Sequence, residues 1–115
     1  MNKLIFTFFI ICNLYNLNTI AQTSTLKVIT TVSNEVLNNF HQKGRIFLFV
    51  NENSNREPRM NTWPGKSNMI FAANLDNWMA EKSFAFDGSV PFVKSVDISL
   101  NKIPYGKYKI QVLWD

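Results

Sequence analysis

The residue types that carry most enzyme chemistry are sparse in this chain. His41 is its only histidine, and it lies in a polar stretch beside Phe40 and Gln42. A catalytic triad needs a histidine together with an activated serine or threonine and an acid. The nearest approach to a Gly-x-Ser-x-Gly nucleophile motif is the stretch around Gly88 and Ser89, which lacks the second glycine. We therefore predict that His41 is a surface loop residue without a catalytic role.

The carboxylates and the cysteine form no recognisable acid–base or metal pattern. A glycosidase needs two carboxylates across a cleft at about 5 to 9.5 Å, and no pair stands out among the eight acidic residues. No Asp-x-Asp or Asp-x-Asn spacing of the kind that supplies calcium ligands occurs. The only cysteine, Cys12, lies in the N-terminal apolar run and leaves the rest of the chain without a thiolate. We therefore predict no metal, no cofactor and no enzyme activity of this chain alone.

The most distinctive charged cluster is Arg56-Glu57-Pro58-Arg59. It lies in residues 51–66, a long irregular segment rich in asparagine and proline. Pro58 holds Glu57 in an extended conformation, so the charged side chains leave the backbone in separate directions. One interpretation is a loop that binds an anion or a partner through Arg56, Glu57 and Arg59. The favoured interpretation is a network of ion pairs and hydrogen bonds that pins the loop, because a loop of this length must satisfy its polar backbone.

Tryptophans supply the second set of candidate binding residues. Trp63 and Trp78 lie in connections between predicted strands, where flat exposed rings side by side would stack on a sugar. Either ring can equally plug an end of the core. Trp114 lies on the inward row of the last predicted strand and is expected in the core.

The N-terminal segment is typical of a secretory signal peptide. Lys3 is followed by an apolar run over residues 4–12, and a small residue, Ala21, precedes the expected cleavage site. The apolar run is too short for a membrane helix, which needs roughly 20 residues. Cys12 is interpreted as part of this discarded segment rather than as a lipid-attachment site, because Ile11 before it is not small. The sequence thus predicts a signal peptide over residues 1–21 and a secreted or periplasmic domain over residues 22–115.

The charge of the predicted domain does not favour nucleic acid. Without Lys3, eleven basic residues face eight acidic ones, which gives a net charge of +3. The basic residues are scattered, whereas a nucleic-acid groove needs a concentrated patch. We predict no nucleic-acid partner and no membrane span in the mature chain.

Apolar patterning predicts short strands along the whole domain. Strands are expected over residues 25–33, 45–50, 68–73, 82–86, 95–100 and 108–115. The continuous apolar run 45–50 is typical of a central strand covered on both faces, and the last strand alternates inward and outward side chains. Residues 34–43 are expected to form a polar loop or one helical turn. About six or seven strands without a convincing helix predict an all-β fold, a single Ig-like antiparallel β-sandwich.

Several motifs occur in an order that points to a family. They are Gly44-Arg45-Ile46-Phe47-Leu48-Phe49-Val50, Arg56-Glu57-Pro58-Arg59, Leu75-Asp76-Asn77-Trp78, residues 84–87, and Leu100-x-x-Ile103-Pro104-x-Gly106-x-Tyr108-x-Ile110-Gln111-Val112. The series resembles the N-terminal β-sandwich module of secreted esterases from Bacteroidetes and related bacteria. In those proteins the module precedes an α/β-hydrolase domain similar to enterochelin esterase. That hydrolase part has no counterpart in this sequence, so no catalytic residue of the family maps onto it.

Two functions from different classes follow from the sequence. The resemblance implies a non-catalytic accessory module, from a truncated or split gene or a free-standing relative, that packs against a hydrolase domain or subunit. This function requires one face or edge of the module to stay apolar and unpaired. The alternative is a stand-alone carbohydrate- or ligand-binding module that uses Trp63 and Trp78. It requires both rings to lie exposed and side by side.

Overall fold

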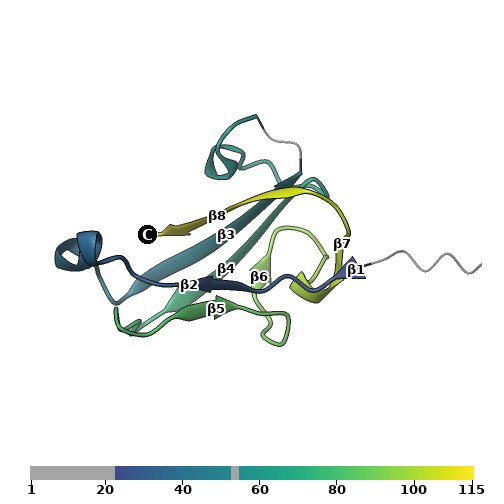
Figure 1. Cartoon of the computed structure of the whole chain (residues 1–115). Helices are drawn as coiled ribbons and strands as arrows, with labels where there is room; N and C mark the ends of the chain where they lie inside the picture. Colours follow the sequence, from purple (N-terminus) through teal and green to yellow (C-terminus); the bar gives the residue numbers. More distant parts are fainter. Residues whose placement is uncertain (1–22, 53–54) are drawn as a thin grey trace, which may run out of the picture.

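The computed structural model describes residues 23–52 and 55–115, which form an antiparallel β-sandwich (Figure 1). Its elements are β1 (Thr23–Ser24), β2 (Val28–Thr30), η1 (Asn34–Asn39), β3 (Gly44–Glu52), η2 (Pro58–Met60), β4 (Asn68–Leu75), β5 (Phe84–Phe86), β6 (Val93–Lys94), η3 (Leu100–Lys102), β7 (Ile103–Pro104) and β8 (Tyr108–Trp114). The predicted all-β antiparallel fold is confirmed. The predicted signal peptide over residues 1–21, with Cys12, lies outside the described residues.

The larger layer is a four-stranded sheet in the order β6-β4-β3-β8. The predicted central strand is confirmed, because β3 lies between β4 and β8 and Leu48 faces Phe71 on one side and Val112 on the other. The pleat of a strand sends successive side chains to opposite faces. The fully buried Ile46 and Leu48 therefore point to the inner face of the sheet, and Phe47 points to the outer face.

The smaller layer pairs β2 with β5, and Val28 faces Phe86 in its register. Leu26, Val28 and Val32 pack against the core, while Ile29 between them is 61% exposed. The strand predicted over residues 25–33 places these three side chains on one face, as alternation along a strand requires. Only three of the residues 25–33 pair in a ladder, because the partner strand β5 is itself only three residues long.

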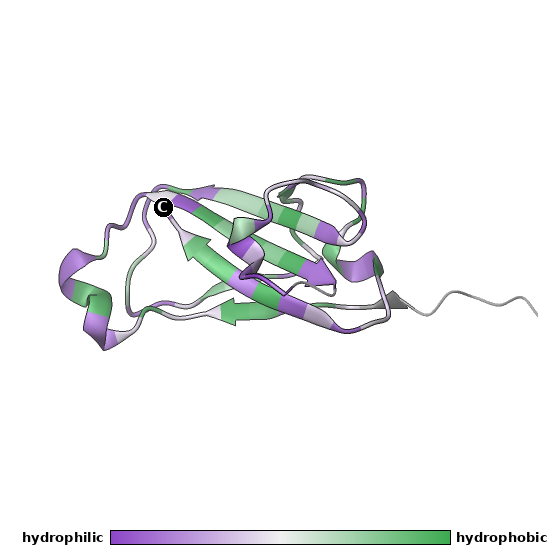
Figure 2. Ribbon diagram, turned by 90° about the horizontal axis from the view of Figure 1, so that it is seen from above, coloured by the Kyte–Doolittle hydropathy of each residue, from purple (hydrophilic) through white to green (hydrophobic). Residues whose placement is uncertain are grey.

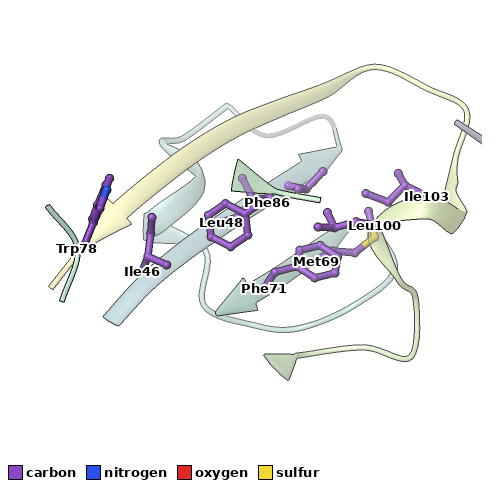
Figure 3. Close-up of a cluster of buried hydrophobic side chains, with 9 residues drawn as sticks. Ile46, Leu48, Met69, Phe71, Trp78, Phe86, Leu100 and Ile103 are labelled. Atoms are coloured by element: carbon purple, nitrogen blue, oxygen red, sulfur yellow. The ribbon is translucent and has the colours of Figure 1, made fainter. Parts of the chain in front are cut away.

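The core lies between the two layers (Figure 3). The four-stranded sheet contributes Ile46, Leu48, Met69 and Phe71, and Phe86 reaches them from β5. Trp78 closes one end of the cluster, whereas Leu100 and Ile103 close the other, as Figure 3 shows. Burial of this apolar area is the main stabilising contribution, because the described part of the chain contains no cysteine for a disulfide.

The segment before β8 differs from the prediction. Residues 95–100 form no strand; the chain bends there, and Ile98 N donates to Val96 O over 2.8 Å before η3 begins. Val96, Ile98 and Leu100, which alternate with polar residues in the sequence, nevertheless all pack against the core. Alternation therefore indicated the buried row correctly. It could not indicate that the edge of β4 is already paired with the two residues of β6.

The closing strand is confirmed as β8, and its alternation is visible as bands of colour on the last arrow of Figure 2. Tyr108, Val112 and Trp114 pack against the core. Ile110 belongs to the same row but is 43% exposed, because β8 is an edge strand and its inner row is covered from one side only. The hydroxyl of Tyr108 donates to the Pro104 carbonyl over 2.6 Å and fixes the turn before the strand.

The connection between β2 and β3 was expected to be a polar loop or one helical turn, and it is helical. It forms the 3₁₀ helix η1, whose N-cap Ser33 accepts a hydrogen bond from Glu35 N. Val36 and Leu37 on this helix are 49% and 42% exposed, so only Phe40 anchors the segment in the core.

Candidate functional site

The loop that carries the charged cluster is folded back and tied to the sheet. Asn68, which is buried, donates from Nδ2 to the carbonyls of Asn61 at 2.8 Å and Trp63 at 2.6 Å. Arg59 N donates to Gln111 Oε1 of β8 over 2.9 Å. Pro58 is buried beneath the loop. The loop is therefore held by hydrogen bonds to β4 and β8 and does not project freely into solvent.

Within that loop the charged side chains pair with each other. Arg59 Nε donates to Glu57 Oε2 over 2.7 Å, and both side chains remain about half exposed. The hydrogen bond and positive charge of Arg59 hold the pKa of the Glu57 carboxyl below its ordinary value. Arg56 is exposed. This is the network of ion pairs and hydrogen bonds expected from the sequence, and it leaves Arg56, Glu57 and Arg59 on one solvent-facing loop.

The two loop tryptophans do not form a platform, so that prediction is wrong. Trp63 is 84% exposed, whereas Trp78 is only 7% exposed. The indole Nε1 of Trp78 donates to Lys82 O over 2.8 Å, and its backbone N donates to Gln42 O over the same distance. Trp78 is buried because both its donors are satisfied by backbone carbonyls while its ring fills the end of the core. Trp63 remains as a single exposed ring.

No acid–base centre forms among the described residues. His41 is exposed as predicted, and its backbone carbonyl accepts a hydrogen bond from Trp114 Nε1 over 3.0 Å. The pKa of Asp87 is lowered, first by the backbone N–H of Ser89 and to a smaller extent by Lys27. A general acid needs a carboxyl pKa raised towards neutrality. The shifts at Glu57 and Asp87 both run the other way.

Tyr108 is the first residue of β8 and follows the turn that leads into this strand. Burial raises the pKa of Tyr108 above its ordinary value, and the negative charge of Glu52 adds to this effect. Its hydroxyl already donates to Pro104 O, so the neutral form is the one that the fold uses. Tyr108 is therefore a structural residue.

The described ranges, 23–52 and 55–115, lack two further kinds of feature. Neither range contains a cluster of three or more histidine, cysteine or acidic side chains that could hold a metal ion. Neither contains a helix of sufficient length and hydrophobicity to cross a membrane.

Apolar side chains form a row across the outer face of the four-stranded sheet, and the sequence indicated only the part of it that lies on β3. In the strand register, Phe47 of β3 faces Ala72 of β4 and Leu113 of β8, and Ala72 faces Val93 of β6. We call these four side chains the outer apolar row. The run 45–50 was expected to be covered on both faces, but the β2–β5 layer covers only the inner one. On this face Phe49 and Ala72 are buried, Phe47 and Leu113 are half-buried, and Val93 is 64% exposed.

Arg45 and Phe49 flank Phe47 of the outer apolar row, one on each side along β3. The guanidinium of Arg45 lies 5.5 Å from the centroid of the Phe47 ring and donates to Asn74 Oδ1 over 3.2 Å. Phe47 in turn stacks on Phe49, with ring centroids 6.2 Å apart. A flat, partly aromatic surface with one arginine at its border has the composition that protein interfaces favour.

An apolar groove also opens beside the edge of β8. Its volume is about 270 Å³. Its apolar lining residues are Val32, Val36, Phe40, Trp78, Val112 and Trp114. The groove lies between the end of β2, the helix η1 and the last strand, so it continues the inner row of β8 to the surface.

Comparison with known proteins adds no further constraint. No family model, no curated protein and no solved structure matches this chain. The surfaces described above and the motifs in the sequence are therefore the basis for inferring a function.

Proposed function

We propose that this chain is a secreted or periplasmic, non-catalytic accessory module that acts by packing against a hydrolase domain or subunit. The family resemblance suggests the class of partner, an α/β-hydrolase similar to enterochelin esterase.

The observation that carries this proposal is the outer apolar row. Strand β3 is apolar on both faces, yet the sandwich supplies a second layer for the inner face alone. Apolar side chains in a row across a sheet gain free energy when a second surface covers them. Val93, at one end of the row, is the most exposed member. A partner domain that packs flat on this face would complete its burial.

The test begins with the DNA that adjoins the coding sequence. If it encodes a hydrolase with a Gly-x-Ser-x-Gly motif, the two chains are co-expressed and co-purification is measured. Val93→Asp should reduce co-purification about tenfold or more, because it places a charge in the contact. Val90→Asp is the matched control, since Val90 is also exposed, at 49%, but lies outside the row. Equal binding by both variants would contradict the proposed surface.

Activity gives a second and independent test. The chain alone should not hydrolyse p-nitrophenyl acetate above the rate of buffer. Turnover that co-purifies with the chain and disappears in His41→Ala would overturn the assignment as a non-enzyme.

The alternative function, carbohydrate binding, retains one supporting observation. Trp63 is 84% exposed on a loop whose backbone is held by Asn68. A single fixed ring can stack on a sugar, although with less area than the two rings first expected. Affinity electrophoresis on soluble polysaccharides tests this: retardation that is lost in Trp63→Ala would favour the alternative over the accessory role.

A further inference from the structure

Strand β8 presents an unpaired backbone edge. Arg45 N donates to Asp115 O over 2.7 Å and Asp115 N donates to Arg45 O over 3.0 Å, so these two residues form a doubly hydrogen-bonded pair. In an antiparallel ladder such pairs alternate, and every second residue directs its N–H and C=O away from the partner strand. Tyr108, Ile110, Val112 and Trp114 are those residues in β8. Within residues 23–52 and 55–115, no backbone group bonds to this edge.

This edge lacks three of the features that usually prevent strand addition, although it carries one charged residue, Lys109. Natural edge strands are commonly short, bulged or interrupted by proline. Here β8 pairs with β3 over seven consecutive residues without a bulge, and it contains no proline. Its inner row is apolar, and Ile110 is 43% exposed at the edge of the sandwich.

We propose that two copies of this chain associate through antiparallel pairing of β8 with β8, centred on Val112. In this register Val112 faces Val112 of the second copy, and Ile110 faces Trp114 of the second copy. The residues whose backbone groups point outward therefore meet one another, and all hydrogen bonds of the new ladder can form. In this arrangement the inward-facing side chains of both β8 strands lie on the same face of the new ladder. The four-stranded sheets of the two copies therefore form one continuous sheet.

Charge complementarity identifies the occupant as a second copy. The same register places Lys109 opposite Asp115 of the second copy, and by the two-fold symmetry this pair occurs twice. Neither side chain forms an ion pair among the described residues. Opposite charges facing each other across an antiparallel pair are stabilising, and like charges are destabilising. Gln111 faces Leu113 of the second copy, so no like charges meet.

The choice of register rests on the strand itself. A register centred on Gln111 instead of Val112 would place Lys107 opposite Asp115 of the second copy and Lys109 opposite Leu113. Lys107 precedes β8, whereas Lys109 and Asp115 both take part in the ladder with β3 or border it directly. A strand of this length buries less area than a standard interface, so we expect a weak dimer whose population depends on concentration.

The test is the oligomeric state of the full chain, expressed with its N-terminal segment and used in the form that is recovered. Sedimentation velocity over about a hundredfold range of concentration should show a monomer–dimer equilibrium. Lys109→Asp and Asp115→Lys should each weaken the dimer about tenfold, because each creates two like-charge pairs. The double reversal, Lys109→Asp with Asp115→Lys, should restore dimerisation. Lys107→Asp is the matched control and should leave it unchanged.

A backbone variant tests the ladder independently of charge. Val112→Pro removes the central outward N–H but no hydrogen bond to β3, so it should abolish the dimer while the chain still unfolds cooperatively. A monomer at every concentration, weakening by Lys107→Asp instead of Lys109→Asp, or no rescue by the double reversal would overturn the proposal. Val93→Asp lies on the outer face and should not affect dimerisation, which separates this inference from the proposed function.

Discussion

The rings of Trp78 and Trp114 meet edge to face, with centroids 5.1 Å apart and planes at 84°. One comes from the connection after β4 and the other from the last strand, so the contact joins two distant parts of the chain. Each indole N–H donates to a backbone carbonyl, that of Lys82 for Trp78 and that of His41 for Trp114. Phe40 completes the cluster at one end of the sandwich.

The first prediction separates Trp78 from Trp63. Trp78→Ala should lower the free energy of unfolding by about 3–5 kcal/mol, because it removes a buried ring and leaves a cavity. Trp63→Ala should change it by less than about 0.5 kcal/mol, because that ring is exposed. Urea denaturation of both variants measures the difference. If Trp78→Ala does not fold, Trp78→Phe keeps an aromatic ring and should still be clearly less stable than Trp63→Ala; equal stability of these two would contradict the assignment of Trp78 to the core.

The second prediction concerns the close approach of β3 and the last strand at Gly44. A Cβ built on Gly44 would overlap the backbone carbonyl oxygen of Asp115 and lie 2.8 Å from Cζ2 of Trp114. Gly44→Ala should therefore destabilise the domain by about 1–3 kcal/mol, since both strands must shift. Gly65→Ala is the control: nothing lies within 4 Å of its Cβ. Thermal unfolding should rank Gly44→Ala well below the wild-type chain and Gly65→Ala level with it or slightly above.

A comparison of Trp63 with Trp78 shows where sequence analysis reached its limit. Both tryptophans lie in connections, so local pattern treats them alike. Their different burial depends on contacts with residues far away in sequence, among them the bond from Trp78 N to Gln42 O and the packing on Trp114. Such contacts follow from the assembled sandwich and leave no local signal.

The strands, too, could be predicted only in part from the sequence. The continuous run in β3 and the alternation in β8 predicted the centre and the closing strand correctly, because burial on a sheet imposes those periods on the sequence. The two-residue β6 was missed and residues 95–100 were assigned to a strand. Both errors concern which segment pairs with β4, which depends on backbone hydrogen bonds rather than on side-chain patterning. The outer apolar row was likewise invisible until the register of Phe47, Ala72 and Leu113 was known.

The third prediction is a pH dependence at the Glu57–Arg59 pair. The pKa of Glu57 is lower in the folded chain than its ordinary value of 4.5, chiefly because of Arg59. A lowered folded-state pKa means that the ionised carboxylate stabilises the fold above the ordinary value, and that this contribution is lost as the pH falls through the lower folded value. The gap in unfolding free energy between the wild-type chain and Glu57→Gln should thus be present at neutral pH and close below pH 4.5. A gap that widens on acidification would contradict the assigned sign.

The fourth prediction tests whether Asn68 holds the loop. Its Nδ2 group donates to Asn61 O and Trp63 O, while its side chain is buried and its Oδ1 has no hydrogen-bond partner among the described residues. Asn68→Ala removes both donors and should cost about 1–3 kcal/mol, because two carbonyls lose their partner. Limited proteolysis within residues 55–66 should accelerate by more than the change in global stability explains.

The loss in Asn68→Ala should be specific to the donated hydrogen bonds. Asn68→Asp keeps the size of the side chain but replaces the amide donor with a buried charge, so it should be at least as destabilising as alanine. Asn74→Ala is the matched control, because Asn74 lies on the same strand and is exposed. If Asn68→Ala leaves the loop as resistant to protease as Asn74→Ala does, the loop is held by Pro58 and Arg59 instead.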